Sequence, residues 1–148
     1  MKKVVREKMF ETNSSSVHSL LINPKRMGKN RLKMKNGYVL ADFGKFGKDY
    51  EIYKTQNDKL SYLLTELYYM NHYETDIEDM YQFKYIEEAI MDYDDSVIGV
   101  KILNKVEPEL DHQSIPEYGE SKFVDYWRKS SIQSFIFNND IWISTDCD

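Results

Sequence analysis

Residues 31–43, with the sequence RLKMKNGYVLADF, carry the clearest local signal in this chain. Polar and apolar residues alternate before Asn36-Gly37, and a mainly apolar run follows that pair. An Asn-Gly pair between two such runs is the strongest short-range indication of a β-hairpin, because both turn positions require a positive φ. The sequence therefore predicts a hairpin whose strands cover residues 31–35 and 38–43.

Helical periodicity follows the hairpin. The spacing i, i+3, i+4, i+7 predicts an amphipathic helix over residues 57–71, with an inner stripe of Leu60, Leu63, Leu64, Leu67 and Met70. A second helix is predicted to begin at Thr75-Asp76-Ile77-Glu78, where Thr75 and Glu78 can form a capping box. Its expected inner face is Met80, Phe83, Ile86, Ile90 and Tyr93.

Strand-like runs occupy both ends of the chain. Residues 16–22 and 97–103 are rich in apolar and β-branched residues, and a short helix is expected from Ser121. A second hairpin is predicted from residues 132–137 and 141–145 around a turn at 138–140. We therefore expect an α+β fold and a single domain over residues 1–148. Its antiparallel or mixed sheet would be built from the N- and C-terminal hairpins, with two to three helices on one face.

Composition excludes several classes of protein. The chain has 148 residues, of which 41% are hydrophobic and 30% charged, as in soluble globular proteins. No apolar run approaches the roughly 18 residues of a membrane span, and no secretory signal pattern is visible. Cys147 is the only cysteine, which excludes a disulfide framework and a cysteine-based zinc site. We expect a cytoplasmic protein (in the host cytoplasm if a phage encodes it) with no cofactor, metal or membrane partner.

Charge is distributed unevenly along the chain. Residues 1–50 contain 12 Lys and Arg against 4 Asp and Glu, a balance of +8. Residues 51–148 contain 8 against 21, a balance of −13, which gives the net charge of −5. Such asymmetry favours contact between the basic part and nucleic acid or phosphate. The alternative is that the two halves neutralise each other in the folded state.

Residues 11–19, with the sequence ETNSSSVHS, form the densest polar cluster. Consecutive hydroxyls and backbone N–H groups in such a loop can cradle an anion. The candidate ligand-binding residues are these polar residues and basic side chains of the first third, together with an Asp-His pair far along the chain: Arg6, Thr12, Asn13, Ser14, Ser15, Ser16, His18, Arg26, Arg31, Lys33, Asp111 and His112. The alternative is a Ser-rich turn that leads into a strand, with His18 hydrogen-bonded and inert.

Two distant histidines allow an enzymatic alternative. His18 and His112 could act as acid and base in phosphodiester cleavage, with Ser114 or Ser14 positioning the phosphate. Residues 112–115, HQSI, match the His-x-Ser/Thr-hydrophobic element of two-histidine phosphoesterases. Residues 18–21, HSLL, have leucine where the hydroxyl residue belongs. This hypothesis is a metal-independent phosphodiesterase or nuclease.

Two further segments allow binding functions. The basic segment 44–48 could contact a nucleic-acid backbone while Phe46 stacks on a base, or it could be a solvated loop. The acidic segment could bind a basic protein surface through its carboxylates and tyrosines, or it could be a solvated helix face. Its members are Tyr73, Glu74, Asp76, Glu78, Asp79, Tyr81, Tyr85, Glu87, Glu88, Asp92, Tyr93, Asp94 and Asp95.

The N-terminal string, residues 10–19 with the sequence FETNSSSVHS, together with the later DHQS at 111–114, resembles a signature of small phage and low-GC bacterial proteins. The resemblance implies a phage or prophage origin and action against host defence, for example inhibition of a CRISPR effector. Our leading hypothesis is a non-enzymatic protein that engages RNA or a nucleotide through its basic N-terminal third. A host defence complex is a further expected partner.

Overall fold

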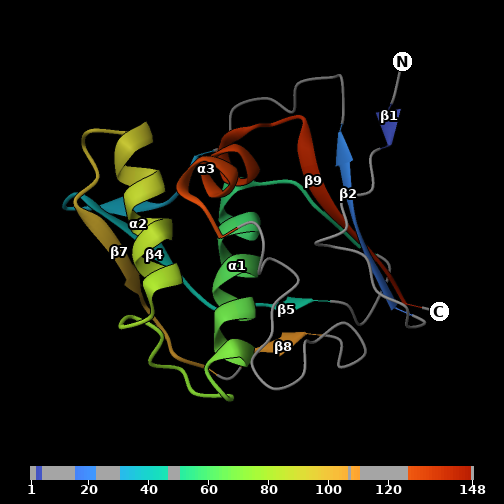
Figure 1. The fold of residues 1–148 in the computed structure, drawn as a ribbon, viewed down its shortest axis with the longest axis horizontal. Helices are drawn as coiled ribbons and strands as arrows, with labels where there is room; N and C mark the ends of the chain where they lie inside the picture. The colour runs from blue at the N-terminus through green and yellow to red at the C-terminus, as the bar shows by residue number, and fades with distance from the viewer. Residues whose placement is uncertain are drawn as a thin grey trace.

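Helix α1, Gln56–Met70, stands at the centre of the molecule, with other elements on both sides of it (Figure 1). The computed structural model describes residues 3–4, 16–22, 31–46, 51–106, 108–110 and 127–147. Within these residues the fold is a small α+β domain of three helices and small antiparallel and mixed sheets. The predicted fold class is therefore confirmed.

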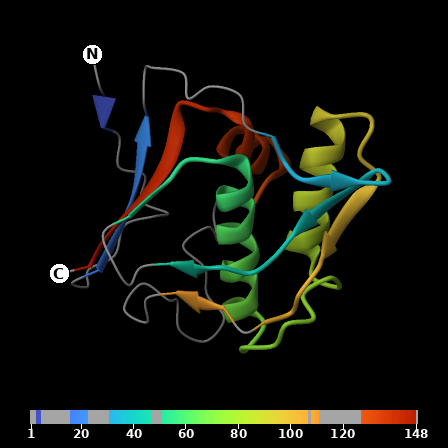
Figure 2. The same ribbon diagram turned by 180° about the vertical axis from the view of Figure 1, so that it is seen from behind.

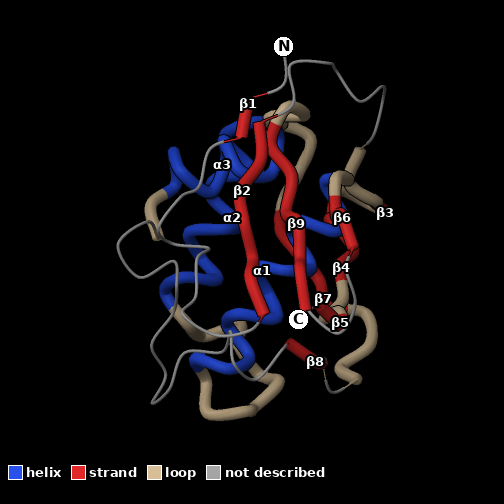
Figure 3. Tube along the Cα trace, turned by 90° about the vertical axis from the view of Figure 1, so that its right-hand side faces the viewer, coloured by secondary structure: helices blue, strands red, loops and turns tan. Residues whose placement is uncertain are grey.

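Three sheets surround α1. The antiparallel sheet has the strand order β1 (Lys3–Val4), β2 (Ser16–Ile22), β9 (Ile141–Cys147) and β6 (Glu51–Tyr53). The mixed sheet has the order β3 (Met34–Lys35), β4 (Tyr38–Ala41) and β7 (Gly99–Ile102). A parallel pair is made by β5 (Lys45–Phe46) and β8 (Glu109–Leu110). Figure 3 shows β2 and β9 side by side, in front of the helices.

The predicted hairpin is confirmed around Asn36-Gly37, although its strands are shorter than predicted, at Met34–Lys35 and Tyr38–Ala41. Asn36 and Gly37 have φ values of 55° and 84°, the left-handed conformation that this turn requires. The turn places Lys35 opposite Tyr38 and Met34 opposite Val39. Strand β7 then adds in parallel on the other side of β4.

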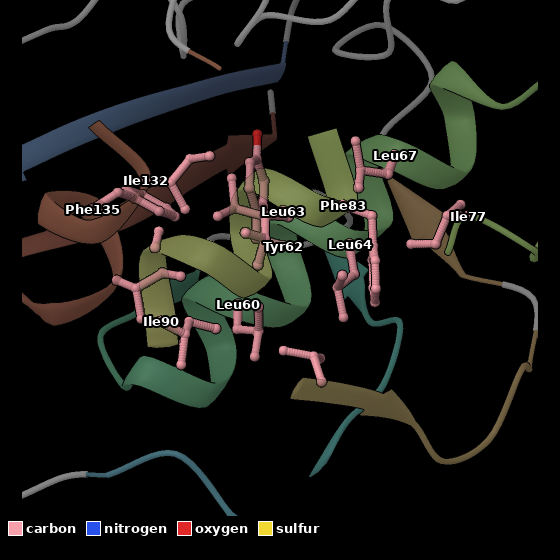
Figure 4. Close-up of a cluster of buried hydrophobic side chains, with 14 of the residues drawn as sticks. Leu60, Tyr62, Leu63, Leu64, Leu67, Ile77, Phe83, Ile90, Ile132 and Phe135 are labelled. Atoms are coloured by element: carbon pink, nitrogen blue, oxygen red, sulfur yellow. The ribbon is translucent and has the colours of Figure 1, made fainter. Parts of the chain in front are cut away.

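Helix α1 begins where predicted, and the Thr55 hydroxyl caps it by accepting from the backbone N–H of Asp58 at 3.0 Å. The predicted inner stripe is confirmed, with Met70 only half-buried, but burial extends beyond that stripe, because every residue from 62 through 69 is buried. Figure 4 shows side chains of α1 packed among those of α2 and α3. A helix that is apolar on nearly every face belongs in an interior, and α1 is the centre of the core.

The second helix begins later than predicted. Helix α2 is Tyr81–Tyr93, and Thr75 lies in the preceding loop, so the predicted capping box is wrong. The Asn71 side-chain amide donates to carbonyls of that loop, and Ile77 is fully buried and anchors it. Tyr93, expected on the inner face, is 57% exposed and stacks on Phe137 instead.

The predicted C-terminal hairpin is wrong in its first strand. Lys129–Phe137 is helix α3, although its sequence is rich in strand-forming residues. Ile132, Phe135 and Ile136 follow the helical i, i+3, i+4 spacing, and all three are buried in the core. Tertiary packing outweighs the strand propensity of this short run. Strand β9 pairs with β2 and β6 instead.

Two predicted strands are confirmed, at residues 16–22 as β2 and within residues 97–103 as β7. The predicted helix from Ser121 lies outside the described residues, apart from the buried Trp127. Among the helices of the described segments, none is long and apolar enough to cross a membrane.

Candidate functional site

The mixed sheet has one face covered by helices and one face open. Val39 and Val100 are paired in register on its inner face and belong to the hydrophobic core. In Figure 2 the strands β3, β4 and β7 lie in front of α2, and no described element covers the near side. Among the described residues, no helix or strand covers the outer face of this sheet.

Lysines line this open sheet face. Lys35 is paired with Tyr38, and directly opposed residues share a face. Lys33 lies two residues before Lys35, and its carbonyl accepts from the N–H of Leu40, so it falls on the same side. Lys101 is paired with Leu40 from the other strand. The three lysines are exposed, whereas Tyr38 and Leu40 between them are half-buried.

Tyr38 and Lys101 are in direct contact. The Lys101 Nζ lies 4.0 Å from the centroid of the Tyr38 ring. Gly99, in register with Tyr38, leaves room for the ring, because an ideal Cβ on Gly99 would lie 3.1 Å from Tyr38 Cε1. The open sheet face thus has an aromatic ring at its centre and an ammonium over it.

Side chains occupy backbone groups at both edges of the sheet. At the β3 edge, Asn57 of α1 accepts from the N–H of Lys33 at 3.1 Å and donates to the Arg31 carbonyl at 2.9 Å. At the β7 edge, Glu87 of α2 accepts from the N–H of Val100 at 2.9 Å.

Carboxylates border the open sheet face rather than lying on it. Glu87 Oε2 accepts from Val100, and Asp42 Oδ1 accepts from the N–H of Asn104 at 2.7 Å. The strand positions on the face itself are lysine, tyrosine, leucine and glycine. The local charge is therefore positive, although the chain as a whole carries −5.

Two of the predicted ligand-binding residues lie at this site. Lys33 is on the open sheet face, and the exposed Arg31 precedes it. Arg31 also interacts with Asp94: the pKa of Asp94 is lowered mainly by hydrogen bonds from Ser96, with a smaller electrostatic contribution from Arg31. Sequence reasoning missed Lys35, Tyr38 and Lys101, although the alternation around Asn36-Gly37 placed Lys35 and Tyr38 in facing strands.

The Ser/His-rich residues are placed only in part. Ser16 and His18 belong to β2, with backbone partners Cys147 and Thr145 in β9. Helix α1 stands between β2 and the mixed sheet (Figure 1), so these residues and Lys33 belong to different sheets on opposite sides of it. The remaining predicted site residues lie outside the described residues: Arg6, Thr12, Asn13, Ser14, Ser15, Arg26, Asp111, His112 and Ser114.

A second group of polar side chains lies inside the molecule, on α1. Lys59 is fully buried, and its Nζ donates to the carbonyls of Asn138 at 3.0 Å and Ile141 at 2.9 Å. Burial lowers the pKa of Lys59 to about 8. Burial also raises the pKa of Tyr62, and the neighbouring Glu66 adds to this effect. These contacts tie α1 to the α3–β9 turn.

Sequence reasoning missed this interior group because charged residues on a helix are normally assigned to solvent. A signal was present, since tyrosines and leucines between residues 60 and 69 fall on every side of the helix. Such a pattern indicates a buried helix, and any charged residue within it is then buried as well.

The other two predicted binding segments have different outcomes. Phe46 is only 4% exposed and packs against the rings of Tyr53 and Tyr62, so the predicted stacking of a base on Phe46 is wrong. In the acidic segment, Tyr73, Tyr81 and Tyr93 are 63%, 58% and 57% exposed. Binding of a protein to that segment stays a prediction, as does catalysis by His18 and His112.

Within the part of the chain that the structure describes, no group of three or more His, Cys, Asp or Glu side chains is arranged to hold a metal ion. The chain matches no protein-family model, no curated protein and no solved structure.

Proposed function

We propose that this protein binds RNA or a nucleotide through the open sheet face. The observation that supports this is the placement of Lys33, Lys35 and Lys101 around Tyr38 on a surface that no described element covers. Exposed ammonium groups on such a surface attract phosphates and release their counterions. The proposal assigns no reaction to the site.

The spacing of the lysines favours a chain of phosphates over a single one. Lys33 and Lys101 are both opposite Leu40 and lie about 10 Å apart across the sheet, and Lys33 and Lys35 are about 7 Å apart along the chain. A mononucleotide phosphate reaches only part of this area. An RNA strand can place successive phosphates near all three ammonium groups, so we favour RNA within this proposal.

The biological role that we propose is counter-defence by a phage. It is supported by the resemblance of the N-terminal string, and a host RNA or an RNA-containing defence complex is the partner that this role requires.

The test is RNA binding measured by fluorescence anisotropy as a function of salt. Replacing the three face lysines together (K33Q, K35Q and K101Q) should weaken binding and reduce the slope of log K against log salt by about 2, because each contact with a single strand contributes about 0.7. The matched control replaces three exposed lysines elsewhere, Lys84, Lys105 and Lys129, by Gln.

Both triple variants change the net charge by the same amount, so a general electrostatic effect would weaken them equally. The proposal requires the face variant to lose more affinity and more salt dependence than the control. Equal losses, or no binding by the wild type at about 50 mM salt, would contradict it.

A further inference from the structure

We propose that the open sheet face binds single-stranded nucleic acid by stacking an unpaired base on the ring of Tyr38, an inference that rests on the proposed function and specifies its ligand. Tyr38 is on the central strand, in register with Lys35 on one side and Gly99 on the other. The ring therefore lies in the middle of the basic surface, where a base carried by a bound strand would meet it.

Gly99 makes this position suitable for stacking. An ideal Cβ at Gly99 would approach Tyr38 Cε1 to 3.1 Å and Cδ1 to 3.3 Å, closer than ordinary van der Waals contact. A larger side chain would force the ring to shift and would occupy space above the sheet. Gly99 is itself buried, and Glu87 Oε2 would lie 3.2 Å from the same Cβ, so the glycine allows the half-buried ring to lie close to the β7 backbone.

Lys101 covers the ring in the free protein. Its ammonium, 4.0 Å from the ring centroid, makes a cation–π contact that at an exposed site is worth about a factor of 2 to 5 in an equilibrium constant. A base stacked on an aromatic side chain contributes about a factor of 5 to 150. The base is the stronger partner, and the long, exposed Lys101 side chain can turn to the adjacent phosphate.

The same geometry selects single strands. In a duplex each base is paired and is covered above and below by its neighbours, so its π-face cannot reach Tyr38 unless the base is unstacked. Strands whose bases are already unpaired avoid that cost, and sheet-borne aromatic rings are a recurrent means of binding them. Lys33 and Lys35, on the β3 side of Tyr38, would hold the phosphates that flank the stacked base.

The decisive experiment compares three ligands with the wild-type protein: an oligoadenylate RNA of about ten residues, an abasic strand with the same phosphates, and an RNA duplex of the same length. We expect the abasic strand to bind about 5- to 150-fold more weakly than the oligoadenylate, and the duplex to bind more weakly as well. 2-Aminopurine placed in the single strand should lose fluorescence on binding, because stacking on the ring quenches it.

Variants of Tyr38 and Lys101 test whether the preference for a strand with bases comes from the Tyr38 ring. Tyr38→Leu should bind the oligoadenylate and the abasic strand equally, whereas Tyr38→Phe should keep the preference and the quenching because it keeps the ring. Lys101→Met should keep the quenching and reduce the salt slope by about 0.7. Should Tyr38→Leu fail to fold, equal affinity of the wild type for the oligoadenylate and the abasic strand would still overturn base stacking.

The outcomes separate this inference from the proposed function. Equal affinity for the oligoadenylate and the abasic strand would overturn base stacking and leave phosphate binding intact. Stacking outside Tyr38 is the conclusion if quenching persists unchanged in Tyr38→Leu, which also overturns the inference. Failure of all three ligands to bind at about 50 mM salt would overturn the proposed function itself.

Discussion

Lys59 and Lys101 each place an ammonium near an aromatic ring, but in opposite environments. The Nζ of Lys59 lies 5.9 Å from the ring centroid of Phe135, and the residue is fully buried. Lys101 is exposed and has the ring of Tyr38 beneath it. The buried ammonium also donates to two backbone carbonyls, because a charge removed from water requires hydrogen-bond partners.

The difference shows how the position of a lysine in the fold decides its use. Lys59 is fixed by acceptors on the α3–β9 turn and holds three elements together. The exposed Lys101 ammonium can exchange its contact with the Tyr38 ring for water. It can therefore move to a ligand phosphate with little loss of free energy. The interior lysine should therefore control stability, and the lysine of the open sheet face should control binding.

The largest effect that we predict is from Lys59→Ala. This change leaves a cavity and removes the donor from the backbone carbonyls of Asn138 and Ile141, so the free energy of unfolding should fall by about 3–5 kcal/mol. Lys101→Ala is the matched control and should change it by less than about 0.5 kcal/mol. Urea denaturation followed by circular dichroism measures both. Similar losses in the two variants would contradict the contrast between these lysines.

Gly44 and Gly99 show the same contrast between the interior and the open sheet face. An ideal Cβ on Gly44 would lie 2.6 Å from Cε2 of the buried Phe46 and 2.8 Å from Oγ of Ser61, which is half-buried and donates to the Asp42 carbonyl. Gly44→Ala should therefore lower the free energy of unfolding by about 2–3 kcal/mol. At Gly99 the nearest atom belongs to the half-buried Tyr38 ring, which can move, so Gly99→Ala should cost less than about 1 kcal/mol. Thermal unfolding of the two variants tests this order.

The pH dependence of the free energy of unfolding should show the titration of the buried Lys59. Its pKa is lowered from 10.5 to about 8, so above pH 8 the folded state binds fewer protons there than the unfolded state does. The free energy of unfolding should consequently rise by about 2 kcal/mol between pH 7 and pH 10. Above pH 10 Tyr62 reverses the trend, because its pKa is raised and the unfolded state loses that proton first.

Lys59→Met is the variant for this measurement, since it keeps most of the side-chain volume and cannot titrate. Its free energy of unfolding should lack the Lys59-dependent rise between pH 7 and pH 10 that the wild type shows. A rise of the same size in Lys59→Met would assign the effect to other groups.

The local signals in the sequence predicted the parts of the fold that short-range physics determines. Asn36-Gly37 fixed the hairpin because few other residues accept both turn conformations. The leucine spacing of α1 indicated a helix, but it did not show that Lys59 and Glu66 are buried too. That burial depends on β9 and α3, which reach α1 from far along the chain.

The predictions that were wrong or incomplete also depend on contacts between segments that are distant in the sequence. Thr75 and Glu78 match a capping box, yet the buried Ile77 holds that segment as a loop. Residues 132–137 suit a strand or a helix, and only packing against α1 and α2 selects the helix. At the candidate site, Lys33 was predicted from charge, whereas Lys101 needed the parallel pairing of β4 and β7, which joins segments about sixty residues apart.

The smallest change in stability that we predict is at Glu87, which lies between the hydrophobic core and the open sheet face. Its carboxylate accepts from the N–H of Val100 and carries a negative charge beside the open sheet face. Glu87→Gln keeps an oxygen acceptor but loses the charge, so the free energy of unfolding should fall by about 1 kcal/mol or less. Glu88→Gln is the control, because that exposed carboxylate lies 3.9 Å from Lys129 and contributes little.

RNA affinity should respond in the opposite direction to stability in Glu87→Gln. Removing a negative charge from the edge of β7 strengthens the positive potential around Lys101, so this slightly less stable variant should bind RNA more tightly than Glu88→Gln does. Anisotropy titrations at low salt, where screening is weakest, give the largest difference. If Glu88→Gln binds RNA as tightly as Glu87→Gln, the gain comes from net charge, and proximity to the open sheet face is not its cause.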